Sequence, residues 1–167
     1  MNRVTSRTFT PAGQTDVSFN VGYSYVAAGI FTMTYPSMRQ VKYDYDSAGR
    51  VSAVTGVATG SSGSSAKVNY ATDLKYASHG GLREVTYDNS LVEQRTYSTS
   101  LQPRTITVGT TRGTTDTGSN RLKLEYSYCV NLATADCGGN NGDVTIQKMD
   151  SAATQVYSYD GVNRLSR

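Results

Sequence analysis

The stretch Val41-Lys-Tyr-Asp-Tyr-Asp-Ser-Ala-Gly-Arg-Val-Ser-Ala-Val54 decides the fold of this chain. Its first half alternates apolar and polar residues, with Val41, Tyr43 and Tyr45 on one side, which is the period of a strand with one buried face. The following four residues, Asp46 to Gly49, have the composition of a type I turn. Asp at the first position accepts backbone N–H groups, and Gly at the fourth tolerates positive φ. The stretch therefore predicts a β-hairpin whose return strand begins at Arg50.

The same unit recurs along the chain when the tyrosine before the turn is taken as an anchor. Six anchors follow one another at spacings of 20, 31, 21, 31 and 31 residues: Tyr25, Tyr45, Tyr76, Tyr97, Tyr128 and Tyr159. A second tyrosine stands two residues before four of them, at Tyr23, Tyr43, Tyr126 and Tyr157, so ten of the 13 tyrosines share one register. A fixed period is the signature of a repeat protein. We infer a unit of about 20 residues, with an insertion of ten or eleven residues in three copies.

The turn glycine varies between the copies in an interpretable way. It is kept as Gly29 and Gly80, and Asn163 takes its place after Tyr159, where Asn also tolerates the left-handed region. The Tyr97 unit has Leu101 instead, and in the Tyr128 unit the glycine is delayed to Gly142. We therefore expect the same kind of turn after each anchor, with ten extra residues inside the turn that follows Tyr128.

The other two insertions are rich in Gly, Ser and Thr. They cover residues 56–65 and 109–119. Such composition is typical of loops, so we expect both insertions to form long, flexible hairpin loops.

The composition favours an all-β fold. The chain has 13 Tyr against 3 Phe and no Trp, only 17% charged residues, and no sustained helical periodicity. A lone hairpin is only marginally stable in water, so neighbouring hairpins are expected to pair edge to edge into a continuous twisted sheet. We predict an N-terminal lead-in at 1–16 and antiparallel hairpin repeats at 17–167, as a fragment of a longer array. Its open edges would accept further repeats or other copies of the chain.

Two of the units resemble a known repeat family. Tyr43-Asp44-Tyr45-Asp46-Ser-Ala-Gly49-Arg50-Val51 and Tyr157-Ser-Tyr159-Asp160-Gly-Val-Asn163-Arg164-Leu165 resemble the YD repeat of bacterial Rhs proteins, teneurins and the BC component of Tc toxins. The stretches Tyr97–Pro103 and Asn140–Val144 are similar to variant repeats of bacterial Rhs proteins, and the resemblance spans roughly Val17 to Arg167. It implies a strip of hairpins that spirals into a hollow shell. Such shells enclose a C-terminal toxic polypeptide in bacterial toxins and support cell adhesion in teneurins.

The resemblance implies a scaffold or encapsulation segment of a secreted or cell-surface protein, with an enclosed effector domain as a partner. The family's autoproteolytic aspartates and a toxin domain are not recognisable here, so neither activity is carried over. An alternative is an adhesion or carbohydrate-binding module with a glycan or cell-surface protein as partner, because rows of tyrosine can stack on sugars. The alternation of the tyrosines with Val and Leu favours a packed face over a binding face.

No catalytic residue or cofactor is predicted, so we do not expect an enzyme. Asp44 and Asp46 share a strand face, but a calcium site needs several more oxygen ligands, and we expect a solvated side chain and a turn cap instead. The only histidine, His79, is expected to be a solvated turn residue. Arg50 and Arg164, both just after a turn, are expected to pair with carboxylates of neighbouring hairpins.

The two cysteines, Cys129 and Cys137, are eight residues apart. They are too few for a zinc site, and a local disulfide and two free thiols are both open. The net charge is +3, and the basic residues are scattered rather than clustered, which argues against a nucleic-acid partner. No apolar stretch approaches the length of a membrane span, and the first residues lack the apolar core of a signal peptide, so membrane insertion is not expected.

Overall fold

The computed structural model describes residues 2–14, 17–59, 65–112, 120–130, 132, 137–150 and 153–166. Within these residues the regular secondary structure consists of twelve β-strands, as the all-β prediction requires. Their bounds are β1 Ser6–Phe9, β2 Phe19–Val26, β3 Gly29–Thr34, β4 Gln40–Tyr45, β5 Val51–Thr59, β6 Ser65–Tyr76, β7 Leu82–Tyr87, β8 Val92–Tyr97, β9 Pro103–Gly109, β10 Asn120–Ser127, β11 Ile146–Met149 and β12 Ala153–Val156.

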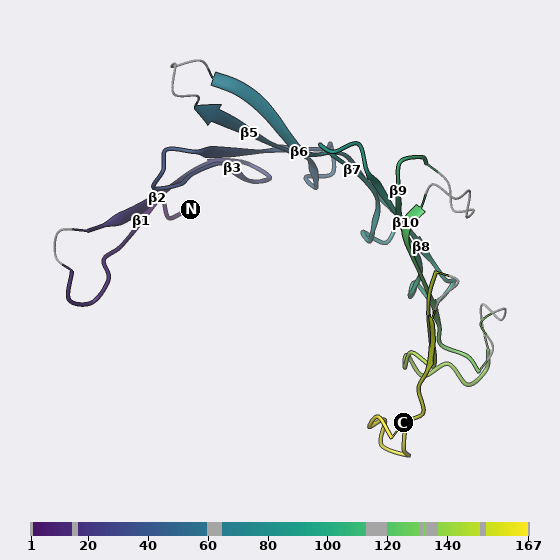
Figure 1. Cartoon of the computed structure of the whole chain (residues 1–167). Helices are drawn as coiled ribbons and strands as arrows, with labels where there is room; N and C mark the ends of the chain where they lie inside the picture. The colour runs from purple at the N-terminus through teal and green to yellow at the C-terminus, as the bar shows by residue number, and fades with distance from the viewer. Residues whose placement is uncertain are drawn as a thin grey trace. The chain divides into compact units, whose positions relative to one another are not determined.

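The order of the strands in the sheet is their order in the chain, from β1 to β12 (Figure 1). Each hairpin therefore pairs with the next one along the sequence, and the pairing is antiparallel, for example between β2 and β3 and between β3 and β4. This confirms the prediction of tandem hairpins joined edge to edge. The chain divides into two compact units, residues 1–74 and 75–167, and each is described by itself.

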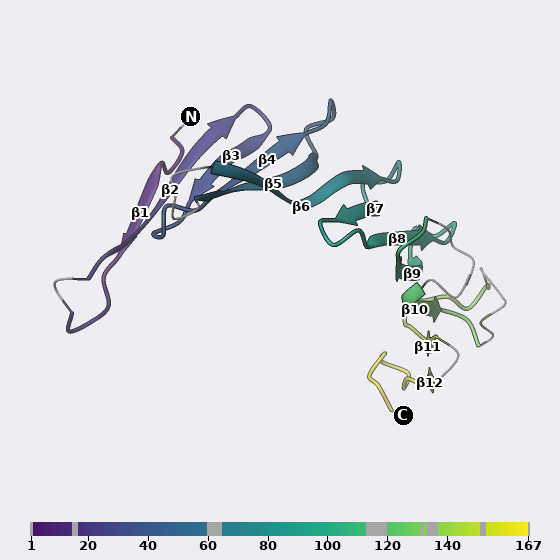
Figure 2. The ribbon, with the colours of Figure 1, turned by 45° about the horizontal axis from the view of Figure 1, so that its top comes forward.

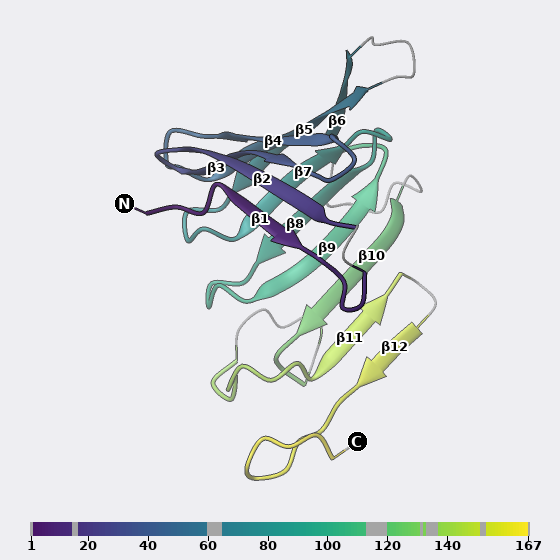
Figure 3. The same ribbon diagram turned by 90° about the vertical axis from the view of Figure 1, so that its left-hand side faces the viewer.

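Each unit is a single layer of strands. Figure 2 shows strands β1 to β5 of the first unit side by side, and Figure 3 shows β8 to β12 of the second in the same way. In the part of the chain that the structure describes, no side chain is completely buried. All ten tyrosines of the common register are half-buried, and within each unit the described residues form no second layer of strands over them. The expected packed face thus exists, but it is packed only by its neighbours in the same sheet.

Six turns share one pattern of hydrogen bonds. The N–H of the first residue donates to the carbonyl of the fifth, and the N–H of the fourth donates to the carbonyl of the first, as between Asp46 and Arg50 at 2.8 Å and between Gly49 and Asp46 at 2.9 Å. The fourth residue has a φ between 60° and 91° in all six. These fourth residues are Met38, Gly49, Gly80, Ser90, Leu101 and Asn163. The predicted turn is confirmed after Tyr45, Tyr76, Tyr97 and Tyr159, and the turns at Tyr35–Arg39 and Tyr87–Leu91 were not predicted.

The hairpin after Tyr25 differs from the prediction. Val26 pairs directly with Gly29, so the connection has only two residues, Ala27 and Ala28. Gly29 does not have a positive φ. Its role is to make space, because a Cβ added there would lie 2.6 Å from the hydroxyl of Tyr45.

The boundaries of the lead-in and of the insertions also change. The lead-in at 1–16 already contains β1, whose Phe9 pairs with Phe19 of β2. Residues 56–59 of the first predicted loop belong to β5. Residues 60–64 of that loop, and residues 113–119 of the second, lie outside the described part of the chain.

Candidate functional site: tyrosine staples, turn clamps and the cysteine loop

Five anchor tyrosines make the same long-range hydrogen bond, which we call the tyrosine staple. The hydroxyl of Tyr45 donates to the carbonyl of Ile30, near the start of the return strand of the preceding hairpin, at 2.7 Å. The other four staples join Tyr25 to Val4 at 2.7 Å, Tyr97 to Leu82 at 2.7 Å, Tyr128 to Pro103 at 3.0 Å and Tyr159 to Val144 at 2.8 Å. Sequence reasoning found the register of these tyrosines but missed the role of their hydroxyls. The excess of Tyr over Phe was the available signal.

Two glycines allow the tyrosine ring to lie close to the neighbouring backbone. Gly29 and Gly81 each stand immediately before the residue whose carbonyl accepts the staple. A Cβ on Gly81 would lie 2.7 Å from the hydroxyl of Tyr97, as one on Gly29 would lie 2.6 Å from that of Tyr45. A side chain at either position would displace the tyrosine that makes the staple.

A carboxylate closes the turns of the two units that match the repeat pattern best, and we call this arrangement the turn clamp. Oδ1 of Asp46 accepts the N–H groups of Ala48 and Arg50, both at 2.9 Å. Oδ2 accepts Nε of Arg50 at 2.9 Å and its Nη2 at 2.8 Å. The backbone N–H of Arg50, followed by its side chain, holds the pKa of Asp46 below the usual range of an aspartate.

The second turn clamp repeats the first. Asp160 accepts the N–H groups of Val162 and Arg164 at 3.0 Å, and the guanidinium of Arg164 at 2.8 and 2.7 Å. The backbone N–H of Arg164 is the main cause that lowers the pKa of Asp160. We expected both arginines to pair with carboxylates of neighbouring hairpins, whereas the carboxylate is that of their own turn. A spacing of four residues across a tight turn brings the two side chains of each turn together.

Asp44 and His79, which were also considered as functional candidates from the sequence, contact other side chains of the sheet. Asp44 forms an ion pair with Lys42 at 2.8 Å. His79 is exposed on its turn, and its ring meets that of Tyr97 edge-on with the centroids 4.5 Å apart. Among the described residues, no group of three or more His, Cys, Asp or Glu could hold a metal ion. A search of the same residues for a helix long and apolar enough to cross a membrane also finds none.

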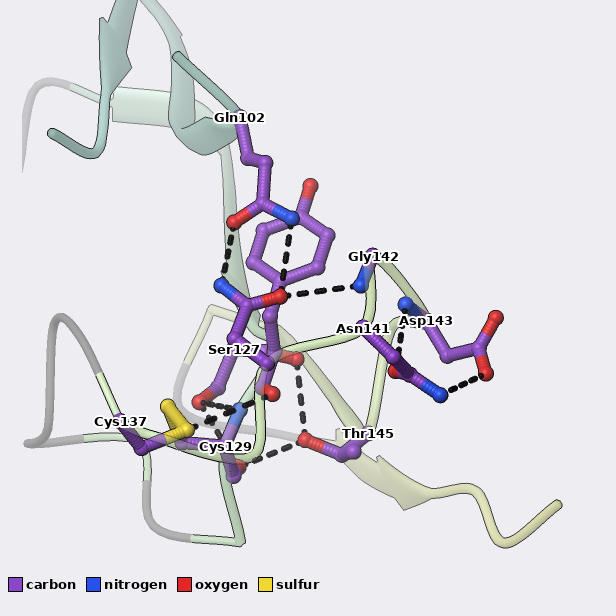
Figure 4. Close-up of a disulfide and its surroundings, with 10 residues drawn as sticks. Gln102, Ser127, Cys129, Cys137, Asn141, Gly142, Asp143 and Thr145 are labelled. Atoms are coloured by element: carbon purple, nitrogen blue, oxygen red, sulfur yellow. Dashed lines mark hydrogen bonds between the residues drawn. A yellow bond between two sulfur atoms is a disulfide. The ribbon is translucent and has the colours of Figure 1, made fainter. Parts of the chain in front are cut away.

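The cysteine loop, residues 128–145, connects β10 to β11. Cys129 and Cys137 are joined by a disulfide of 2.16 Å (Figure 4). Thr145 closes the base of the loop, because its N–H donates to the carbonyl of Ser127 at 2.8 Å and its hydroxyl donates to that of Cys129 at 2.6 Å. Gly142 has a φ of 99°, as expected for the delayed turn glycine.

Side-chain amides bind the cysteine loop to a turn on each side of it in the sequence. Gln102 and Asn140 exchange two hydrogen bonds, at 3.0 and 2.6 Å. Asn141 donates to the side-chain oxygen of Asn163 at 3.1 Å. Gln102 is the last residue of the turn after Tyr97, and Asn163 lies in the turn after Tyr159. The loop therefore touches both flanking turns.

A buried carboxylate on a strand of the second unit is paired with basic side chains. The carboxylate of Glu84 is buried and accepts Lys75 at 2.7 Å and Gln94 at 3.0 Å, and Arg112 lies 3.1 Å away. The hydrogen bond from Lys75 is the main cause that lowers the pKa of Glu84. These contacts hold neighbouring strands together, and they occupy the carboxylate of Glu84 with partners in the sheet.

The first unit also has an open, mostly apolar pocket of about 510 Å³. It is lined by Phe19, Tyr35, Pro36, Ser37, Arg39 and Val41. Phe19 and Tyr35 are 44% and 39% exposed, so both rings are accessible from solvent. The guanidinium of Arg39 lies over the ring of Tyr70, 4.9 Å from its centroid, and donates from Nε to its hydroxyl at 2.9 Å.

Comparison with known proteins supports the fold. No protein-family model matches the chain, and no curated protein matches its sequence. Among the crystal structures that match its fold are TcdB2-TccC3 (TM-score 0.75, 15% identity), TcdB2-TccC3 without its hypervariable C-terminal region (0.75, 17%) and TcdB2-TccC3-TEV (0.72, 16%). They cover 97%, 97% and 91% of this chain. The fold is that of a segment of these proteins. The chain spans only 7–8% of the length of the chains that it matches.

Proposed function

We propose that this chain is a non-catalytic structural segment of an Rhs/YD-repeat protein, and that it forms part of a β-shell. The shell would scaffold or enclose a C-terminal toxin or effector. The observation that carries the proposal is the tyrosine staple, which joins a hairpin to the preceding one by the same hydrogen bond in five places. A contact that repeats from unit to unit lets an array grow by addition of hairpins.

The single layer of each unit supports the same proposal. A sheet without a second layer leaves one face for the interior and the other for the exterior of a wall. The fold is shared with TcdB2-TccC3, one crystal structure of which lacks a hypervariable C-terminal region. We propose that this chain belongs to a secreted protein of the same plan, in which the variable polypeptide is the enclosed partner.

The pairing of the charged groups supports a role without catalysis. Asp46 and Asp160 are engaged in turn clamps, and Glu84 is held by Lys75 and Arg112. A general acid or base needs a group that can exchange a proton with a substrate, which these pairs oppose.

The proposal is tested by electron cryo-microscopy and limited proteolysis of the gene product that contains residues 1–167. We expect a hollow wall of hairpins with a protease-resistant polypeptide inside it. The matched control is the same protein after mild unfolding, in which that polypeptide should be cleaved. A protein in which the hairpins enclose nothing, and in which no segment is protected, would contradict the proposal.

The pocket lined by Phe19 and Tyr35 favours a second candidate, carbohydrate binding. Two accessible aromatic rings beside Arg39 and Ser37 offer stacking surfaces and hydrogen-bond donors that suit a sugar. A glycan array with the wild-type chain and the Tyr35→Ala variant tests this candidate. Binding that the variant loses would support it, and an array without signal above background would exclude it for the sugars tested.

A further inference from the structure

The cysteine loop is the one connection in the described part of the second unit that is bonded through side-chain amides to the turns on both sides. We propose that the Cys129–Cys137 disulfide is a redox-controlled clasp, which holds the loop against these two turns when oxidised and releases them when reduced. The inference goes beyond the proposed function, because it concerns only contacts within residues 98–164. It holds whether or not the chain encloses another polypeptide.

Burial does not hold three described residues of the loop, one next to Cys129 and two next to Cys137. Val130 is 95% exposed, and Gly138 and Gly139 are exposed and have no side chains to pack. These three residues gain little from the hydrophobic effect, so their positions depend on covalent and polar contacts. The disulfide supplies the covalent contact.

The disulfide joins a cysteine with a fixed backbone to a cysteine close to the two amides. Cys129 is only 3% exposed, and its backbone is bound by the hydroxyls of Ser127 and Thr145 (Figure 4). Cys137 is half-buried and lies just before the two amides that reach the neighbouring turns. Asn140 and Asn141 follow it by three and four residues. The disulfide therefore holds the segment with both amides on the side of Cys137, and Val144 and Thr145 hold it on the other side.

The two neighbouring turns differ in how strongly their own residues close them. The turn after Tyr159 has its own clamp, in which Asp160 binds Arg164. The turn after Tyr97 lacks a carboxylate and is closed by the hydroxyl of Ser98, which accepts the N–H of Gln102 at 3.2 Å. Its Leu101 is also left-handed without being glycine. Release of the clasp should therefore loosen the turn after Tyr97 more than the turn after Tyr159.

The chemistry of release is thiol–disulfide exchange with a thiol reductant. A reductant thiolate attacks the more accessible sulfur, that of Cys137, and the thiolate of Cys129 leaves and takes up a proton. A second thiolate then attacks the reductant sulfur of the mixed disulfide, and Cys137 leaves as a thiolate that is protonated. Two reductant thiols are oxidised to one disulfide, and the protein disulfide is reduced to two thiols.

Hydrogen–deuterium exchange with mass spectrometry of the whole chain tests the clasp, with and without excess dithiothreitol. On reduction, we expect faster exchange in the loop base at Thr145 and in the turn Ser98–Gln102, by up to about 80-fold from the chain entropy of the opened ring. A smaller increase is expected in the turn Asp160–Arg164. The turns Asp46–Arg50 and Ala77–Gly81 are internal controls and should not change. Reoxidation should restore the original rates.

Two variants separate the disulfide from the amides. Gln102→Leu, kept oxidised, should speed exchange in the turn Ser98–Gln102 and leave the turn Asp160–Arg164 unchanged. The double variant Cys129→Ser, Cys137→Ser should lose all response to dithiothreitol. Unchanged exchange in both flanking turns on reduction would overturn the proposal. So would an equal increase in the control turns, because it would mean that reduction unfolds the chain generally rather than opening a clasp.

Discussion

The turn Asp46–Arg50 and the cysteine loop both return the chain after an anchor tyrosine, and both lead to a strand that pairs with the strand before it. The turn does so in five residues, and the carboxylate of Asp46 closes it from within. The loop needs residues 128–145 and is held by a disulfide and by amides of its neighbours. The staples beside them are alike, because Tyr45 and Tyr128 both bind a carbonyl of the preceding hairpin.

The difference shows that the repeat has two separable parts. The staple lies between hairpins and is kept when the turn changes. The turn is local, and it can be replaced by a longer connection if another constraint takes over the work of the aspartate. We therefore expect changes in the cysteine loop to affect several hairpins, and changes in the turn Asp46–Arg50 to affect one.

The largest effect is expected from removal of the disulfide. The double variant Cys129→Ala, Cys137→Ala should lower the free energy of unfolding by about 2.5 kcal/mol, because the opened ring regains chain entropy in the unfolded state. Urea unfolding followed by circular dichroism measures this change. Wild-type protein in dithiothreitol should match the variant, and the variant itself should not respond to dithiothreitol. Equal stability of the oxidised and reduced wild type would show that the loop contributes no constraint.

The staples should give the next largest effect. Tyr45→Phe removes a hydroxyl and leaves the carbonyl of Ile30 without this donor, so we expect a loss of about 1 kcal/mol in unfolding free energy. Tyr128→Phe should cost less, because its hydrogen bond is longer and exposed, at 3.0 Å rather than 2.7 Å. Tyr126→Phe is the matched control, since the described part of the chain gives the Tyr126 hydroxyl no hydrogen bond. A loss at Tyr126 as large as at Tyr45 would contradict the staple.

The sequence predicted the parts of the repeat that depend on residues close together. The alternation around Tyr43 and Tyr45 predicted the strand, and Asp46 and Gly49 predicted the turn with its left-handed fourth residue. Both follow from backbone sterics and from contacts over four residues or fewer. The order of the strands also followed, because each hairpin could pair only with the next one without a long crossover.

The sequence could not predict the contacts between distant residues. The acceptor of each staple lies 15 to 25 residues before its tyrosine, and it is a backbone carbonyl, which no residue type reveals. The space-making role of Gly29 has the same origin, because it depends on the ring of Tyr45. The left-handed conformation of Met38 was unpredictable for another reason. The turn requires it although a residue with a Cβ disfavours it.

A smaller effect of opposite sign is expected at Leu101. This residue is 56% exposed and has a φ of 63°, which is unfavourable for any residue with a Cβ. Leu101→Gly should raise the free energy of unfolding, by less than about 1 kcal/mol, because glycine also gains entropy in the unfolded chain. Thermal unfolding detects the shift, and Leu101→Ala separates relief of the backbone from loss of the side chain. A destabilised Leu101→Gly with an unchanged Leu101→Ala would mean that the turn is not strained.

The smallest effect, and the most specific to the turn clamp, is on the pH dependence of stability. Hydrogen bonds from Arg50 and Arg164 lower the pKa of Asp46 and of Asp160 in the folded chain. A carboxylate with a lowered folded pKa stabilises the fold above its unfolded pKa, which is about 3.9. That contribution is lost as the pH falls through the folded pKa. Stability should therefore decrease below about pH 4, and less steeply in the double variant Asp46→Asn, Asp160→Asn.

Both carboxylates are at the surface, so solvent screening keeps the dependence of stability on pH weak. A control variant is therefore needed to separate the turn clamp from a general effect of charge. Asp88→Asn removes one negative charge from the turn Tyr87–Leu91, where the described residues give Asp88 no hydrogen bond or ion pair. Thermal unfolding between pH 2 and pH 6 at two salt concentrations compares the three proteins. Because the clamp consists of hydrogen bonds at fixed positions, its slope should persist in high salt, whereas a general charge effect should be screened. If Asp88→Asn flattened the profile as much as the double variant, net charge alone would explain the acid sensitivity, and the turn Asp46–Arg50 would owe its closure to the backbone.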